Sequence, residues 1–286
     1  MRESGAQRYP GLRSRATCLG SGSDGTATIE ERHDHPRHPL TSAAPALEAR
    51  GVRHAYGAVP ALDGVDLLVP AGEAVALVGE SGSGKTTLLR CFNRTVEPDA
   101  GQVLVRGAPV VGAAPVRLRR TLGFVPQEGG LMPHWSVLRN AALVPRLRGE
   151  ADADERARAA LDAVGLPAAE YGGRWPVQLS GGQRQRVAIA RALAGDSDIV
   201  LLDEPFGALD AITRSDLQDQ FADLRARRGF SVLLVTHDLH EAFLLADRIA
   251  VMRNGAIEQL GAPSELRQRP ATGYVEALLR RARVSA

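Results

Sequence analysis

Apolar and polar residues follow two periods along this chain, one typical of strands and one typical of helices. Short apolar segments that predict strands occur at 47–52, 65–69, 74–78, 103–105, 122–125, 199–202, 232–235 and 248–252. Segments with helical spacing lie between them, at 85–95, 137–146, 154–164, 183–194, 214–228 and 239–246. The segments 199–202 and 232–235 are apolar at every position, which favours parallel strands covered by helices on both faces. The pattern therefore predicts an α/β fold.

The same pattern divides the chain into regions. Residues 1–45 are rich in Gly, Ser, Arg, Pro and His and show no periodicity, so we expect a disordered leader; a misassigned start of translation stays open as an alternative. We expect one main domain over 46–270 and a C-terminal helix or tail over 271–286. Within the main domain, the stretch after residue 131 has helical spacing and no strand pattern, which predicts an inserted helical subdomain at about 131–180.

The only lysine of the chain lies in a glycine-rich segment between a predicted strand and a predicted helix. Lys and Arg together number 35, and Lys85 alone is a lysine. The segment 79–86 fits G-x-x-x-x-G-K-[ST], a loop whose backbone amides face the phosphates of a nucleotide. A compact ammonium reaches between phosphate oxygens in a tight loop, whereas a planar guanidinium needs more room. We therefore expect Lys85 to bind phosphate and the hydroxyl of Thr86 to bind Mg²⁺.

Two further segments carry candidate chemistry. Asp203 and Glu204 follow the apolar strand 199–202, and the carboxyl ends of parallel strands form the ligand crevice of such a sheet. We expect Asp203 to hold Mg²⁺ and Glu204 to polarise an attacking water; the alternative, a simple helix cap, is weaker beside the Lys85 loop. Ser180 can cap the helix that follows it, where two glycines allow a close approach to phosphate.

At this point the sequence resembles the ATP-binding cassette (ABC) ATPases. Leu179-Ser180-Gly181-Gly182-Gln183 is similar to the family's signature motif, and the other family motifs follow in the family's order. They are an aromatic for adenine stacking, the Q-loop glutamine, the D-loop and the switch histidine, here Tyr56, Gln127, 207–210 and His237. The resemblance covers roughly residues 46–270. It implies a P-loop NTPase fold with a mixed or parallel sheet core, an N-terminal antiparallel β part and a helical subdomain.

The resemblance also implies a role for each matching residue. Catalytic roles fall to Lys85, Gln127, Glu204 and His237, and Mg²⁺ ligation to Thr86, Gln127 and Asp203. ATP binding falls to Tyr56, Gly79, Glu80, Ser81, Gly82, Ser83, Gly84, Lys85, Thr86, Thr87, Gln127, Ser180, Gly181, Gly182, Gln183, Asp203 and Asp210. In this family two copies pair head to tail, so that the signature segment of one copy caps the ATP on the Lys85 loop of the other.

A narrower resemblance concerns transport. The segments 92–98, 128–145 and 209–214 are similar to importer ATPases for glycine betaine, choline and related osmoprotectants, although Glu128 stands where the family often has a second glutamine. The resemblance implies multi-span permease partners, an indirect solute-binding protein and a place at the cytoplasmic face of the membrane. Two alternatives stay open: an amino-acid importer of the methionine type, and an ABC switch protein without transport. We expect Leu131, Met132, Pro133 and Trp135 to offer an apolar socket for a permease helix, with a local core role for Trp135 as the alternative.

Composition narrows the function further. The net charge of +2 over 286 residues gives no support to nucleic-acid binding, and no apolar run is long enough to span a bilayer. Cys18 and Cys91 do not form a disulfide framework, and Cys91 is expected to be buried filler rather than a redox site. The histidines 33, 35 and 38 sit in the polar leader, which favours a solvated tail over a metal site.

Overall fold

The computed structural model describes residues 44–283, so nearly all of the predicted leader, with Cys18 and the histidines 33, 35 and 38, lies outside the described residues. The strands are β1 Leu47–Tyr56, β2 Val59–Val69, β3 Ala74–Val78, β4 Ala100–Val105, β5 Ala108–Pro109, β6 Gly123–Val125, β7 Ile199–Asp203, β8 Ser231–Val235, β9 Arg248–Arg253 and β10 Ala256–Gly261. The helices are α1 Lys85–Phe92, α2 Pro115–Thr121, α3 Val137–Ala141, α4 Leu143–Arg148, α5 Ala153–Ala163, α6 Ala168–Tyr171, α7 Gly181–Ala194, α8 Ala211–Arg228, α9 Leu239–Leu245, α10 Pro263–Gln268 and α11 Gly273–Arg281.

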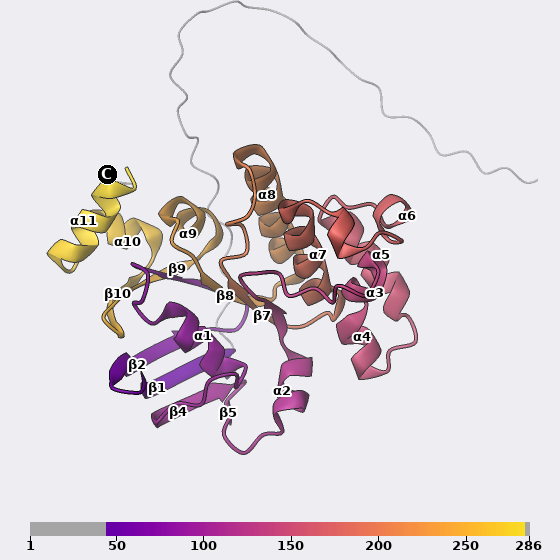
Figure 1. The fold of residues 1–286 in the computed structure, drawn as a ribbon. Coiled ribbons are helices and arrows are strands. Elements are labelled where there is room, and N and C mark those ends of the chain that lie inside the picture. Colours follow the sequence, from indigo (N-terminus) through magenta and orange to yellow (C-terminus); the bar gives the residue numbers. More distant parts are fainter. Residues whose placement is uncertain (1–43, 284–286) are drawn as a thin grey trace, which may run out of the picture. The chain divides into compact units, whose positions relative to one another are not determined.

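A six-stranded sheet in the order β10-β9-β3-β8-β7-β6 forms the centre of the described fold (Figure 1). Only the β10–β9 pair is antiparallel, and the other neighbours are parallel. All residues of β3, β7 and β8 are buried, which confirms the expectation of a sheet covered on both faces. Successive side chains point to opposite faces, so Val200 and Leu202 join one core while Ile199 and Leu201 join another.

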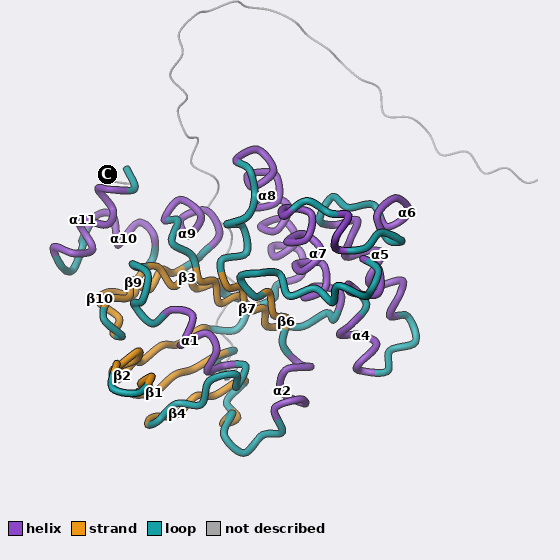
Figure 2. The backbone as a smooth tube through the Cα atoms, viewed as in Figure 1, coloured by secondary structure: helices purple, strands orange, loops and turns teal. Residues whose placement is uncertain are grey.

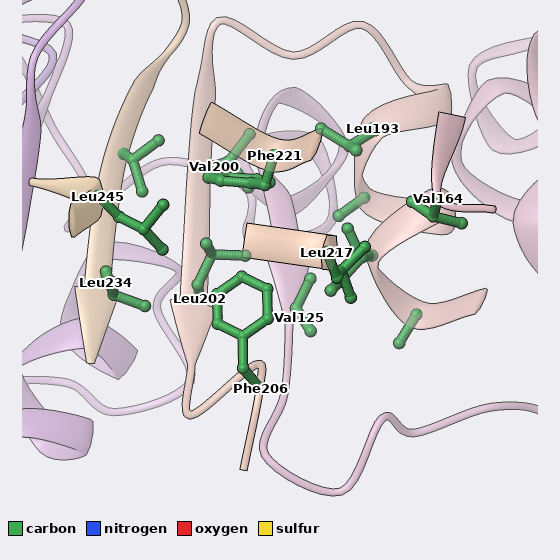
Figure 3. Close-up of a cluster of buried hydrophobic side chains, with 14 of the residues drawn as sticks. Val125, Val164, Leu193, Val200, Leu202, Phe206, Leu217, Phe221, Leu234 and Leu245 are labelled. Atoms are coloured by element: carbon green, nitrogen blue, oxygen red, sulfur yellow. The ribbon is translucent and has the colours of Figure 1, made fainter. Parts of the chain in front are cut away.

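Helices and a second sheet cover the two faces. The core on one face contains buried side chains of α7, α8 and α9, among them Leu217 and Phe221, which pack near Val200 and Leu202 (Figure 3). The core on the other face contains α1 and a four-stranded antiparallel sheet in the order β2-β1-β4-β5 (Figure 2). The expected mixed sheet and antiparallel β part are therefore both present. Cys91 lies in this second core at 0% exposure, as expected of apolar filler.

Two predicted helices end differently in the structure. The segment 137–146 was predicted as one helix, but it forms α3 and α4 because Pro145 has no amide to donate to Ala141. Helix α1 ends at Phe92 and not at residue 95, since the Asn93 side chain accepts the amide of Thr95 (3.0 Å). Among residues 44–283, no helix combines the length and the apolar character that crossing a membrane requires.

Candidate functional site

The glycine-rich loop between β3 and α1 folds around the ammonium group of Lys85. Lys85 Nζ donates to the carbonyl oxygens of Gly79 (2.9 Å) and Glu80 (2.7 Å) and to Ser83 Oγ (3.2 Å). The residue is only 6% exposed, and burial lowers its pKa, against the opposing charges of Glu204 and Asp203. The ammonium is thus held at the centre of the loop, where it adds positive charge to a helix N-terminus.

The first turn of α1 leaves backbone amides free to bind an anion. The amide of Leu88 donates to the carbonyl of Gly84 (2.9 Å). The amides of Lys85, Thr86 and Thr87 precede it and have no backbone acceptor in the part of the chain that the structure describes. Amides of this kind, pointing out of a helix N-terminus, are a general phosphate-binding device.

Two glycines let the loop pack closely against neighbouring backbone segments. Gly79 (φ 148°) and Gly84 (φ 101°) both adopt backbone conformations that L side chains rarely take. A Cβ at Gly79 would lie 2.2 Å from the carbonyl oxygen of Met252, and one at Gly84 would lie 2.4 Å from that of Ala61. The amide of Gly255, in the turn after β9, also donates to the carbonyl of Ser83 (3.1 Å). Neither glycine position has room for a side chain, so the loop is held in one shape.

Thr86 and Asp203, the expected Mg²⁺ ligands, meet directly. Thr86 Oγ1 donates to Asp203 Oδ1 (2.8 Å), and Asp203 is fully buried at the end of β7. Its other oxygen, Oδ2, is buried without a hydrogen-bond partner and lies 3.6 Å from Arg90 Nη2. Burial raises the pKa of Asp203, while the Thr86 hydrogen bond and the Arg90 charge lower it.

The chemistry of this donor set fits Mg²⁺. A hydroxyl and a carboxylate with an unused oxygen are hard ligands, and Mg²⁺ commonly takes one or two protein carboxylates with phosphate and water completing its shell. Within the described residues, no three His, Cys, Asp or Glu side chains gather into a group that could hold a metal ion. Gln127, the third expected ligand, is not hydrogen-bonded to Thr86 or Asp203 here.

Gln127, Glu204 and His237 converge instead on one carboxylate oxygen. Gln127 Nε2 donates to Glu204 Oε2 (3.2 Å), and His237 Nδ1 lies 3.4 Å from the same oxygen. The three residues follow β6, β7 and β8, which are neighbours in the sheet, so their carboxyl ends lie side by side. Glu204 has φ 48°, a strained conformation for a glutamate, and its amide donates to the carbonyl of Val235 (2.9 Å).

The structure places the remaining predicted residues away from the Lys85 loop. Ser180 and Gln183 cap α7 reciprocally, with Gln183 N donating to Ser180 Oγ (3.2 Å) and Ser180 N to Gln183 Oε1 (2.9 Å). Asp210 caps α8 by accepting from the amide of Thr213 (3.0 Å), and this bonding lowers its pKa. No hydrogen bond among residues 44–283 joins Ser180, Gly181 or Gly182 to residues 79–87.

Tyr56 is 54% exposed at the end of β1, and its ring packs edge-on against that of His54 at 4.7 Å. Among the described residues, no hydrogen bond or ring contact joins Tyr56 to the Lys85 loop. Its open face leaves room for stacking.

Two hollows lie at opposite ends of β7. A small one of about 40 Å³ at the carboxyl end borders Glu204 and His237 and also buried Glu241. A larger one of about 540 Å³ at the amino end is lined by residues such as Asp196 and Arg228, and contains none of the predicted site residues. The larger hollow is therefore not the candidate site. The candidate site is identified by the side chains that converge on Glu204.

Sequence patterns did not reveal three polar residues near this site: Arg90, Arg191 and Glu241. Arg191 and Glu241 are 7% and 5% exposed, respectively. The sequence did contain one signal for Arg191. It lies on the buried face of α7, where most of the other residues are apolar.

Comparison with known proteins decides the family. A family profile described as ABC transporter matches residues 62–207, slightly more than half of the chain. The chain belongs to the ABC transporter family. The match begins within β2 and includes the Lys85 loop, the signature segment and Glu204.

Individual relatives extend the similarity. The glycine betaine/carnitine/choline transport ATP-binding protein OpuCA of Bacillus subtilis (strain 168) is 42% identical over 230 residues, covering 80% of this ABC protein and 60% of the relative. The sulfate/thiosulfate import ATP-binding protein CysA of Caulobacter vibrioides is 45% identical over 235 residues, covering 80% and 68%. The carnitine transport ATP-binding protein OpuCA of Listeria monocytogenes is 43% identical, and this chain spans only 56% of its length.

A solved structure agrees with the fold. The dimeric, post-hydrolysis ATP-binding cassette MJ0796, bound to ADP and Pi, is 33% identical with a TM-score of 0.69, covering 76% of this chain and 98% of that one. The described fold is therefore that of an ABC cassette.

Proposed function

We propose that this ABC protein hydrolyses ATP as the energy-coupling subunit of an importer for a quaternary amine such as glycine betaine or choline. The observation that carries the hydrolysis is the contact of Gln127 and His237 with one oxygen of Glu204, beside the Thr86–Asp203 pair. The transport assignment rests on similarity to relatives that are named as transport proteins for carnitine, glycine betaine and choline.

Bound MgATP supplies a phosphoryl group ready for transfer and a metal charge that stabilises the developing negative charge. In this proposal Lys85 and the free amides of α1 bind the phosphates, and the rest of 79–87 encloses them. Thr86 and Asp203 hold Mg²⁺, with Gln127 as a further ligand, and the exposed ring of Tyr56 stacks on adenine. The buried, unpartnered Oδ2 of Asp203 supports the metal assignment.

Glu204 is the general base of the proposed reaction. Its carboxylate accepts a proton from the attacking water, while Gln127 and His237 orient the carboxylate and the water. Glu204 Oε1 takes no part in the contacts with Gln127 and His237, which both engage Oε2, so an acceptor oxygen is left for water. A positioned base contributes typically about 10²- to 10⁴-fold to a rate.

A second copy of the chain completes the site. Ser180, Gly181, Gly182 and Gln183 lie at the N-terminus of α7, which can bind phosphate, but they do not bond to the Lys85 loop of the same chain. The dimeric solved cassette supports a pair of copies. We infer that the two copies pair head to tail, so that these residues, together with Asp210, act on the partner's nucleotide. ATP then stabilises the pair, and hydrolysis releases it.

The membrane partners are proposed on the same grounds. A multi-span permease would hold the subunit at the cytoplasmic face of the membrane, and a solute-binding protein would act through that permease. Met132 is 37% exposed and Trp135 is partly buried beneath Arg139, whose guanidinium lies 4.5 Å from the Trp135 ring centre. This surface, in the segment that follows Gln127, supports a docking role.

The test is ATP-driven uptake in proteoliposomes that contain the subunit and its co-purifying permease. We expect uptake of radiolabelled glycine betaine or choline, and none in a Glu204→Gln variant. Uptake of methionine or sulfate alone would overturn the solute assignment and leave the ATPase assignment intact. ATP binding without turnover or permease partner would favour the switch-protein alternative.

A further inference from the structure

Helix α7 contains a buried arginine whose side chain bonds to a different segment. Arg191 lies in the last turn of α7 and is 7% exposed. Its Nη1 donates to the carbonyl oxygen of Gly130 (2.7 Å) and its Nη2 to that of Gly129 (2.7 Å). Each carbonyl is therefore bound by its own nitrogen of the planar guanidinium, whereas a lysine would offer both carbonyls a single nitrogen on a flexible stem.

Within residues 44–283, Arg191 neither caps the carbonyl end of its own helix nor pairs with a carboxylate. The carbonyls at the end of α7 are bound by other residues: Arg228 Nη1 donates to Leu193 (3.4 Å) and Arg148 Nη1 to Gly195. Burial lowers the pKa of Arg191, and no acidic side chain among the described residues opposes this effect. A charge buried without a carboxylate is costly, so its two hydrogen bonds are the reason for its position.

The two carbonyls belong to the turn that presents Gln127. The amide of Gly129 donates to the carbonyl of Pro126 (2.9 Å), which closes a β-turn with Gln127 as its second residue. Pro126 follows β6 directly, so the sheet fixes one end of the turn. Arg191 fixes the other end, through Gly129. Gln127 then reaches Glu204 Oε2.

We propose that Arg191 is a positioning residue that holds the 126–130 turn against α7 and thereby keeps Gln127 in contact with Glu204. The proposal rests on the proposed function in that Glu204 is the base whose carboxylate Gln127 orients. Helix α7 also carries the Ser180-Gly181-Gly182 segment at its other end. Its 14 residues form a rod of about 21 Å, which links that segment rigidly to the Gln127 turn.

The first test needs no nucleotide. Amide hydrogen exchange of the peptide covering 126–131 is measured in the full chain for wild type, Arg191→Met and Arg191→Lys. The matched control is Arg148→Met, because Arg148 also donates to backbone carbonyls, those of Arg120 (2.7 Å) and Gly195, away from this turn. We expect exchange in 126–131 to accelerate about tenfold or more in Arg191→Met and to stay within about twofold of wild type in the control.

The second test is a double-mutant cycle on ATP hydrolysis. Arg191→Met should lower kcat about tenfold or more and leave KM for ATP nearly unchanged, because the phosphate-binding residues are not touched. In a Gln127→Ala background the same substitution should cost less than about twofold, since the residue through which it acts is gone. Arg148→Met should leave kcat within about twofold of wild type.

Three results would overturn the proposal: unchanged exchange in 126–131, an equal loss of kcat with and without Gln127, or the same effects in Arg148→Met. If Arg191→Met does not fold, Arg191→Lys replaces it in both tests, with the same direction expected. If the wild type hydrolyses no ATP, the proposed function fails, and hydrogen exchange alone decides the role of Arg191.

Discussion

Replacing Glu241 with glutamine should change how the free energy of unfolding depends on pH. Glu241 is 5% exposed on α9; its Oε2 accepts a hydrogen bond from the hydroxyl of Thr236 (3.2 Å), and its Oε1 is buried without a partner. Burial raises the pKa of Glu241 from 4.5 to about 8. The Thr236 hydrogen bond and the charge of Arg214 oppose this rise, while Asp238 and Glu204 add to it.

The direction and size of this change in the free energy of unfolding follow from the difference in proton binding between the folded and unfolded chain. Below pH 4.5 the carboxyl is protonated in both the folded and the unfolded chain. Between 4.5 and about 8 the folded chain keeps the proton that the unfolded chain has lost, so wild-type stability falls as pH rises through this window. Each unit is worth 1.36 kcal/mol. From about pH 5.5 to 7.5, Glu241→Gln should therefore gain about 2–3 kcal/mol relative to wild type, or about 4–12 °C in Tm.

The assay is urea unfolding of the full chain without nucleotide, followed by circular dichroism at three pH values across that window. The control is Glu155→Gln, because Glu155 is exposed in the first turn of α5. Its stability difference from wild type should not vary with pH. A constant difference between wild type and Glu241→Gln would mean that Glu241 is ionised in the folded protein, and would refute the reasoning.

Three other substitutions test the site. Glu204→Gln should lower ATP turnover about 10²- to 10⁴-fold while ATP binding persists and a dimer accumulates in size-exclusion chromatography; retention of more than about a tenth of the turnover would exclude the base role. Lys85→Arg should fail to bind a fluorescent ATP analogue, because Lys85 Nζ fits between two loop carbonyls where a planar fork does not, and full activity would contradict this. Trp135→Ala should weaken co-purification with the permease by about 2 kcal/mol with the subunit still folded and binding ATP, whereas unfolding would assign Trp135 to the local core.

Much of the sheet was predictable from the sequence because its strands are buried on both faces. The bounds of β3 were predicted to the residue, since five apolar positions lead directly into the glycine loop. By contrast, β10 was missed, because all but one of its residues are only partly buried and it includes Glu258 and Gln259. The α3–α4 break was also missed, although Pro145 was the available signal.

Some contacts of the candidate site could also be predicted from the sequence, and others could not. Thr86 and Asp203 were both expected to hold Mg²⁺, and the structure joins them by a hydrogen bond at the carboxyl end of β7. The hydrogen bonds of Arg191 and the burial of Glu241 depend on tertiary packing between segments far apart in the chain. The spacing of apolar and polar residues within one segment does not predict such contacts. Gln127 bonds to Glu204 and not to the Thr86–Asp203 pair, so its role as an Mg²⁺ ligand stays a prediction.

The Lys85 loop packs against a turn that lies far later in the sequence, and this affects when the loop can take its final shape during synthesis. The loop lies against the carbonyl of Met252 and receives a hydrogen bond from the amide of Gly255, yet both residues leave the ribosome long after Lys85. A nascent chain that ends before this turn contains the whole phosphate-binding motif but lacks the surface that shapes it. Nucleotide bound to this loop, as proposed above, would therefore stabilise a late stage of folding, in which the β9–β10 hairpin already lies against the loop.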